Sequence, residues 1–181
     1  MRWLWIDAIL LHEPGARLVA VKNVSLAEEH LHQHFAAGAD GPAQPLMPAS
    51  LMLEGMAQTA GVLVGSVRNF SEKVILAKVT EAVFEQDVVP GQSIRYDAVI
   101  ERLDDMGAST KGVISRWDHR DATCATCATW TDIGRTEIIF SHVDQNRAGL
   151  ELPEHNFVFG ENFRAILGGL LPRPAGHAPS H

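Results

Sequence analysis

One segment limits the possible folds of this chain more than any other: residues 48–68 are apolar or small on nearly every face of a helix. Pro48 suits the first helical turn, where its missing N–H costs no hydrogen bond. The apolar and small residues that follow it are Leu51, Met52, Leu53, Met56, Ala57, Ala60, Val62, Leu63 and Val64. A helix that is apolar all round is a buried one, and at about 1.5 Å per residue this helix spans about 30 Å, the width of a small domain. We therefore expect a central core helix around which the rest of the chain folds.

Most of the remaining chain predicts antiparallel sheet. The predicted strands are 17–23, 74–84, 93–103, 109–117 and 123–143, the last with a break near 132–134. In 93–103, apolar and polar residues alternate as in a strand with one face exposed to water. Val89-Pro90-Gly91 predicts a turn, and the polar segment 26–35 predicts an exposed turn that leads to the helix. A run of strands after one buried helix favours an α+β fold in which a sheet wraps around that helix.

Length and composition predict one domain. The chain has 181 residues, of which 46% are hydrophobic and 20% charged, as in ordinary globular proteins. We expect this domain to occupy residues 1–171. It should carry a short N-terminal extension (1–15, a helix or a turn) and a short C-terminal helix (161–171). The tail, 172–181, is rich in Pro, Gly and His and is expected to be disordered.

Charge and hydropathy exclude several classes of partner. The net charge of −7 provides no excess of basic residues to neutralise phosphates, which argues against nucleic-acid binding. Glu54, Gln58 and Thr59 interrupt the longest apolar region, which is therefore a poor membrane span. Cys124 and Cys127 make neither a disulfide framework nor a complete zinc site. A cytoplasmic protein is expected.

One acid inside the predicted core helix points to chemistry. A buried carboxylate needs a partner, a cavity, or a raised pKa that keeps it protonated. A carboxylic acid that stays protonated near neutral pH is a general acid, which makes Glu54 a candidate for that role. An alternative of equal weight is that Glu54 emerges on an exposed stripe, or is held by the backbone or by Gln58.

A run of three histidines precedes the helix. His30, His32 and His34 could form part of a metal site, but the pattern lacks a fixed third ligand and the His-Glu-x-x-His spacing of helical zinc sites. Exposed side chains are the simpler interpretation of the first two. His34 is followed by an aromatic residue and then by a loop that leads into the helix carrying Glu54. A histidine that faces a protonated carboxyl makes a base–acid pair.

The helix sequence Pro45-Leu-Met-Pro48-Ala-Ser-Leu-Met-Leu-Glu54-Gly-Met-Ala-Gln58-Thr-Ala-Gly61 resembles the central-helix signature of the β-hydroxyacyl-acyl carrier protein dehydratases of hot-dog fold. That family has His-Phe-Pro, then Pro-x-x-Pro-Gly, then four residues and an acid, then x-x-Ala-Gln. Val89-Pro90-Gly91 is similar to the family's turn between strands, and Glu137-Ile-Ile-Phe140-Ser to its closing strand. The resemblance covers residues 17–143, approximately.

The resemblance implies a hot-dog homodimer with two active sites at the interface, each taking a histidine from one subunit and an acid from the other. Carried onto this sequence, these residues are His34 and Glu54. The reaction is the reversible loss of water from a 3-hydroxyacyl thioester, on acyl carrier protein or coenzyme A, with no metal or organic cofactor. The backbone N–H groups of Ala49 and Ser50, at the positive end of the helix dipole, are expected to bind the thioester carbonyl oxygen. Gln58 is also expected to contact substrate.

Two departures from the family pattern keep other functions open. Glu54 follows His34 six positions later than the family's acid follows its histidine, and Ala36 and Ala49 stand where the family has Pro and Gly. A catalytically degenerate hot-dog subunit that binds acyl chains is one alternative. A hot-dog thioesterase, with Glu54 as base or nucleophile, is the other.

Overall fold

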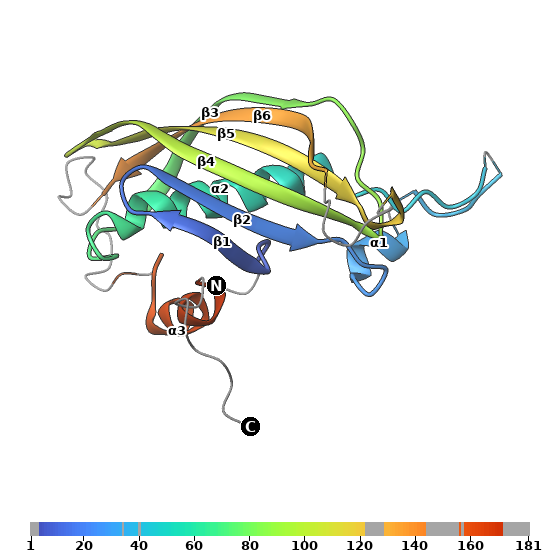
Figure 1. The fold of residues 1–181 in the computed structure, drawn as a ribbon, viewed down its shortest axis with the longest axis horizontal. Coiled ribbons are helices and arrows are strands. Elements are labelled where there is room, and N and C mark those ends of the chain that lie inside the picture. The colour runs from blue at the N-terminus through green and yellow to red at the C-terminus, as the bar shows by residue number, and fades with distance from the viewer. Residues whose placement is uncertain are drawn as a thin grey trace.

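The computed structural model describes residues 4–33, 35–39, 41–121, 129–143, 156 and 158–171. Its elements are β1 (Ala8–Glu13), β2 (Arg17–Asn23), α1 (Glu29–Gln33), α2 (Ala49–Ser66), β3 (Val74–Phe84), β4 (Gln92–Asp104), β5 (Gly107–Asp118), the 3-10 turn His119–Asp121, β6 (Thr131–His142) and α3 (Glu161–Leu170). One antiparallel sheet curls around α2 (Figure 1). The predicted α+β hot-dog arrangement is confirmed.

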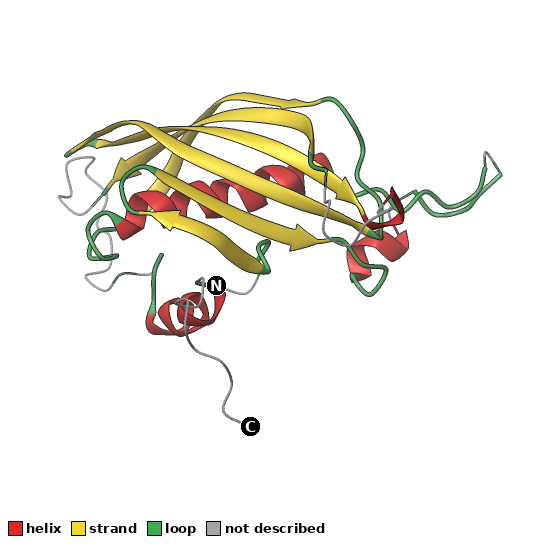
Figure 2. Ribbon diagram, viewed as in Figure 1, coloured by secondary structure: helices red, strands yellow, loops and turns green. Residues whose placement is uncertain are grey.

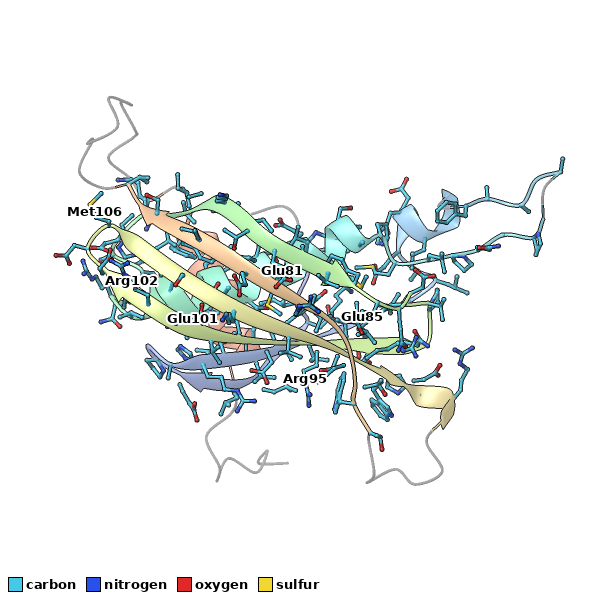
Figure 3. The ribbon with its side chains drawn as sticks, turned by 90° about the horizontal axis from the view of Figure 1, so that it is seen from above. Glu81, Glu85, Arg95, Glu101, Arg102 and Met106 are labelled. Atoms are coloured by element: carbon cyan, nitrogen blue, oxygen red, sulfur yellow. The ribbon has the colours of Figure 1, made fainter. Side chains whose placement is uncertain are left out.

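The sheet has six strands in the order β1-β2-β4-β5-β6-β3. The chain enters as the β1–β2 hairpin, passes along the concave side of the sheet as α2, and joins the opposite edge as β3 (Figure 2). β1 and β3 are therefore the two edges. The outer face carries ion pairs, such as Lys111 with Glu101 at 2.7 Å and Arg135 with Glu81 at 3.0 Å (Figure 3). The side chains of these pairs are exposed to solvent, and α2 covers the other face.

The face of α2 that meets the sheet packs into the hydrophobic core. Met52, Met56 and Leu63 are each at most 2% exposed, and their spacing places them on one side of a helix. Gly55 allows the closest approach between helix and sheet, since a Cβ there would lie 2.4 Å from the ring of Tyr96 on β4. The predicted core helix is therefore confirmed, with Pro48 at its N-cap.

The break predicted near residues 132–134 is a β-bulge within β6. Ile114 pairs with Gly134 and Ser115 with Asp132, so Ile133 is the extra residue. Its side chain is fully buried. A bulge bends and twists a strand without ending it, and here it lets β6 follow the curvature around α2. The turn at Val89-Pro90-Gly91 is also confirmed, with Gly91 at a φ of +87° that favours glycine.

Two predictions before the core helix are wrong. The N-terminal extension is not helical, because residues 8–13 form β1, which pairs with β2 from Ala8–Val21 to Glu13–Arg17. Residues 26–35 are not simply an exposed turn, because they contain α1, whose Leu31 is 2% exposed. Pairing with β2 outweighs the weak local pattern in the first segment, and the burial of Leu31 does so in the second.

The C-terminal helix is confirmed as α3, one residue shorter than predicted. Figure 1 shows it outside the sheet, below β1 and α2. Phe159, Phe163 and Leu167 are buried there. The predicted tail, 172–181, lies outside the described residues. Within the described ranges, no helix combines the length and the apolarity that crossing a bilayer requires.

Candidate active site

Glu54 lies in the second turn of α2, and its side chain is exposed in the single chain. Of the two interpretations left open for Glu54, burial by the apolar core does not hold in the single chain. The reason is geometric: the sheet covers the stripe of α2 that carries Met52 and Met56, whereas Glu54 is on another side of the helix. The alternative of an exposed acid held by Gln58 describes the single chain.

Gln58, one turn after Glu54, fixes the orientation of its carboxyl group. The Nε2 of Gln58 donates to Oε1 of Glu54 at 2.8 Å. The Oε1 of Gln58 accepts the backbone N–H of Trp5 at 2.8 Å. Because a backbone N–H can only donate, the amide oxygen must face Trp5 and the NH2 group must face Glu54. Gln58 itself is 8% exposed. This arrangement assigns it to positioning the acid.

An apolar cavity of about 160 Å³ borders the acid. Of its twelve described lining residues, only Glu54 and Gln58 are polar or charged. The others come from α2, from β3 and β6, and from segments near both ends of the chain; they are Leu4, Ala57, Gly61, Val62, Val74, Leu76, Phe140, Val158, Phe159 and Phe163. A mostly apolar pocket with a few convergent polar groups is the usual form of a small-molecule site.

The start of α2 lies at the same end of the helix as Glu54. Leu51 and Met52 donate their N–H groups to the carbonyl oxygen of Pro48, at 2.9 and 3.1 Å. Helix geometry supplies no acceptor within the helix for the preceding N–H groups of Ala49 and Ser50. No side chain among the described residues caps this end, and both residues are exposed. They are thus placed to bind an oxygen that carries partial negative charge.

The candidate base, His34, lies outside the described residues, as do Cys124 and Cys127. Of the other histidines in the run, His30 packs edge-on against the ring of Trp5, with 5.2 Å between the ring centroids. Its Nε2 lies 3.4 Å from Oε2 of Glu28. Within the part of the chain that the structure describes, no three ligating side chains are grouped to hold a metal ion.

Sequence reasoning missed the contributions of the two chain ends to this site. The backbone of Trp5 orients Gln58, and Val158, Phe159 and Phe163 line the cavity. They lie about fifty residues before and about a hundred residues after the acid. No local pattern relates such distant segments. The amphipathic spacing of the C-terminal helix is the one sequence pattern that indicates a contact. It predicts that one face of this helix is buried, but it does not identify the partner surface.

Comparison with known proteins gives the family. Residues 2–123 match the model of the FabA-like domain. The chain is 31% identical over 123 residues to the 3-hydroxyacyl-[acyl-carrier-protein] dehydratase FabZ of Listeria monocytogenes, covering 67% of this chain and 80% of that protein. The chain belongs to the FabA-like dehydratase family. The enzyme of the same name from Symbiobacterium thermophilum is 41% identical over 96 residues, which cover 52% of this chain and 63% of that protein.

Solved structures share the fold of this FabA-like chain at low identity. The dehydratase heterocomplex ApeI:P of Xenorhabdus doucetiae aligns with a TM-score of 0.56 and 13% identity, over 80% of this chain and 86% of that one. A Streptococcus mutans protein bound to acetyl CoA aligns with a TM-score of 0.54 and 8% identity, over 78% and 92%. At such identities the likeness establishes the hot-dog fold alone.

Proposed function

We propose that this chain is a lyase that dehydrates 3-hydroxyacyl thioesters to trans-2-enoyl thioesters in the cytoplasm, in fatty-acid or related acyl-chain synthesis. The dehydratases to which it is similar support the reaction class. The observation that carries the assignment of the site is the position of Glu54. It lies at the border of an apolar cavity and one turn from the free N–H groups at the start of α2.

In the proposed reaction, His34 removes a proton from C2 of the substrate, and the electron pair forms the C2–C3 double bond. The C3–O bond breaks, and the departing hydroxyl takes a proton from Glu54 and leaves as water. The N–H groups of Ala49 and Ser50 stabilise the negative charge that develops on the thioester oxygen, a contribution worth about 3 kcal/mol. Because Oε1 of Glu54 already accepts the Gln58 amide, the transferred proton is carried on Oε2.

The site is completed, in this proposal, across a homodimer. Two observations support a second subunit. Glu54 is exposed in the single chain, whereas an acid that works in an apolar site is shielded from water. Among the described strands, β3 pairs with β6 alone, so one side of this eleven-residue strand is open (Figure 3). Leu76, on that strand, is 45% exposed. Long open edges with apolar side chains pair with another chain.

The substrate is proposed to arrive as an acyl carrier protein thioester, as the names of the FabZ relatives indicate for those proteins. Coenzyme A thioesters share the reacting atoms and are the practical substrates for an assay. Two other outcomes of an assay with these thioesters would identify the alternative functions. Release of free thiol identifies a thioesterase, and tight thioester binding without turnover identifies a degenerate subunit.

The test is the hydration of crotonyl-coenzyme A, the reverse reaction, followed by the loss of enoyl absorbance. We expect turnover by the wild-type chain and a loss of at least about 100-fold in kcat in both Glu54→Gln and His34→Ala, because each removes one proton-transfer group. Circular dichroism controls for folding. Wild-type activity that survives in both variants would overturn the assignment of the two residues.

A further inference from the structure

We infer that Phe159 and Phe163, from the C-terminal segment, form the end wall of the acyl pocket and restrict this enzyme to short acyl chains. The inference rests on the proposed function, because it takes the cavity beside Glu54 as the place of the acyl group. It adds a determinant of specificity that lies outside residues 2–123, the part of the chain that matches the FabA-like domain.

The wall lies at the end of the cavity opposite the acid. Phe159 packs on Gly65, where a Cβ would approach the phenylalanine ring to 2.6 Å. Gly65 lies eleven residues after Glu54, toward the C-terminal end of α2. Glu54 and Phe159 both line the same cavity. A thioester held at Glu54 therefore directs its acyl tail along α2 toward the two phenylalanines.

The wall is packed tightly. The rings of Phe159 and Phe163 lie 5.4 Å apart between centroids, and Phe70, after the end of α2, lies 5.0 and 6.3 Å from them. Phe159 and Phe163 are each 3% exposed. Three aromatic rings at such distances stabilise one another beyond the area that they bury. Displacing one of them to admit a longer chain would disturb all three.

Polar contacts hold the segment in place at its start. Nδ2 of Asn156 donates to the carbonyl oxygens of Phe70 and Glu72 at 3.1 and 3.0 Å. Its Oδ1 accepts the N–H groups of Val158 and Phe159 at 3.0 and 2.9 Å. One side chain thus connects the C-terminal segment to the loop after α2, with two hydrogen bonds of good length to each. The position of Phe159 is set by this connection as well as by packing.

The size of the cavity sets the expected chain length. Its volume is about 160 Å³, and an apolar cavity of about 150 Å³ holds benzene, a molecule of six carbons. Acyl groups of about four to six carbons therefore fit, and longer groups meet the wall. A methylene that an apolar pocket accepts or rejects changes kcat/KM by about 10-fold or more.

The experiment compares trans-2-enoyl coenzyme A thioesters of four, six and ten carbons in wild type and Phe163→Ala. We expect the kcat/KM of the wild type to fall by at least about 10-fold from six carbons to ten, and the ratio of ten-carbon to four-carbon kcat/KM to rise by about 10-fold in the variant. The matched control is Leu167→Ala. It removes a buried side chain of the same helix that is not among the lining residues, and it should keep the wild-type ratio.

A second readout separates this inference from the proposed reaction. Hexanoyl- and decanoyl-coenzyme A are saturated and cannot be hydrated, so calorimetric binding of these two tests the wall without turnover. A preference of the wild type for hexanoyl that disappears in Phe163→Ala supports the wall, even if no hydration occurs. An unchanged chain-length profile in a folded Phe163→Ala, or the same shift in Leu167→Ala, overturns it. If Phe163→Ala does not fold, Phe163→Leu serves as the smaller change in the same assays.

Discussion

The carboxyl group of Glu54 takes its orientation from one neighbour, Gln58, and Gln58 takes its own from the backbone of Trp5. In the proposed reaction this relay matters because the acid must present its proton to a defined atom of the substrate, and a displacement of about 1 Å can cost about 100-fold in rate. Since the amide can satisfy Trp5 and Glu54 only in one orientation, the relay has a single arrangement. Gln58 thus holds the carboxyl group of Glu54 in one position.

A different side chain, His12, makes stability depend on pH. Its Nε2 donates to Oγ of Ser66 at 2.9 Å, and Ser66 donates to the carbonyl oxygen of Leu63 at 2.7 Å, at the end of α2. Burial lowers the pKa of His12 below its ordinary value of 6.5. The unfolded chain therefore binds the proton more readily, so this contribution to stability is complete above pH 6.5 and is lost as pH falls through the lowered pKa.

We expect the Tm of the wild type to fall more between pH 7 and pH 5 than that of His12→Gln, which cannot take up this proton. Differential scanning calorimetry at several pH values in this range measures the difference. Carboxylates titrate in both proteins, so their effect cancels in the comparison. Parallel pH profiles for the two proteins would contradict the assignment.

At the scale of elements, α2 depends on glycines where neighbours approach it most closely. A Cβ on Gly65 would lie 2.6 Å from the ring of Phe159 and 3.0 Å from Phe70. A Cβ on Gly61 would lie 3.5 Å from Phe140, an ordinary contact distance. The two glycines are in one helix, so intrinsic helix propensity favours alanine equally at both, by about 1 kcal/mol. Packing therefore decides the difference between them.

Gly65→Ala is expected to lower the free energy of unfolding by about 1–3 kcal/mol, because the added methyl group overpacks the site against Phe159. Gly61→Ala, the matched control, is expected to be neutral or stabilising by up to about 1 kcal/mol. Urea unfolding of the two variants measures both values. Equal changes in the free energy of unfolding would contradict the close contact between Phe159 and Gly65.

At the scale of the whole molecule, the proposed site needs two chains. A site that takes His34 from one subunit and Glu54 from the other can be rebuilt from two inactive variants. A mixed dimer of His34→Ala with Glu54→Gln contains one site in which both residues are intact and one in which both are altered. A site within a single subunit would leave each chain of such a dimer with one defect.

We expect the two variants, unfolded together and refolded as a mixture, to regain about a quarter of the wild-type rate, because half of the dimers are mixed and each has one working site. The variants refolded separately should stay inactive. Sedimentation of the wild type should give twice the chain mass of 19.8 kDa. A monomer, or a mixture that regains no activity while both variants remain dimeric, would contradict the shared site.

Much of this fold was predictable because its strongest patterns are local. The helix around Glu54 is apolar on nearly all sides, and the alternation in β4 is regular, so neither needs long-range information. The N-terminal strand was not predictable because its sequence, Ala-Ile-Leu-Leu-His-Glu, does not alternate between apolar and polar residues. Its pairing with β2 has no local signal either. The bulge at Ile133 could be located as a break in the pattern, but its form could not, because the partner strand defines it.

The amino-acid sequence by itself determined the central helix, the sheet that wraps it, the family, and the acid and amide that follow Pro48, because helix periodicity and residue type are properties of neighbouring positions. Only the tertiary structure decided that Glu54 is exposed in the single chain, that Gln58 points its amide at the acid, and that Phe159 and Phe163 line the cavity. These three facts depend on which surfaces meet. Contacts between residues fifty to a hundred positions apart result from the packing of the entire chain, which no local pattern encodes.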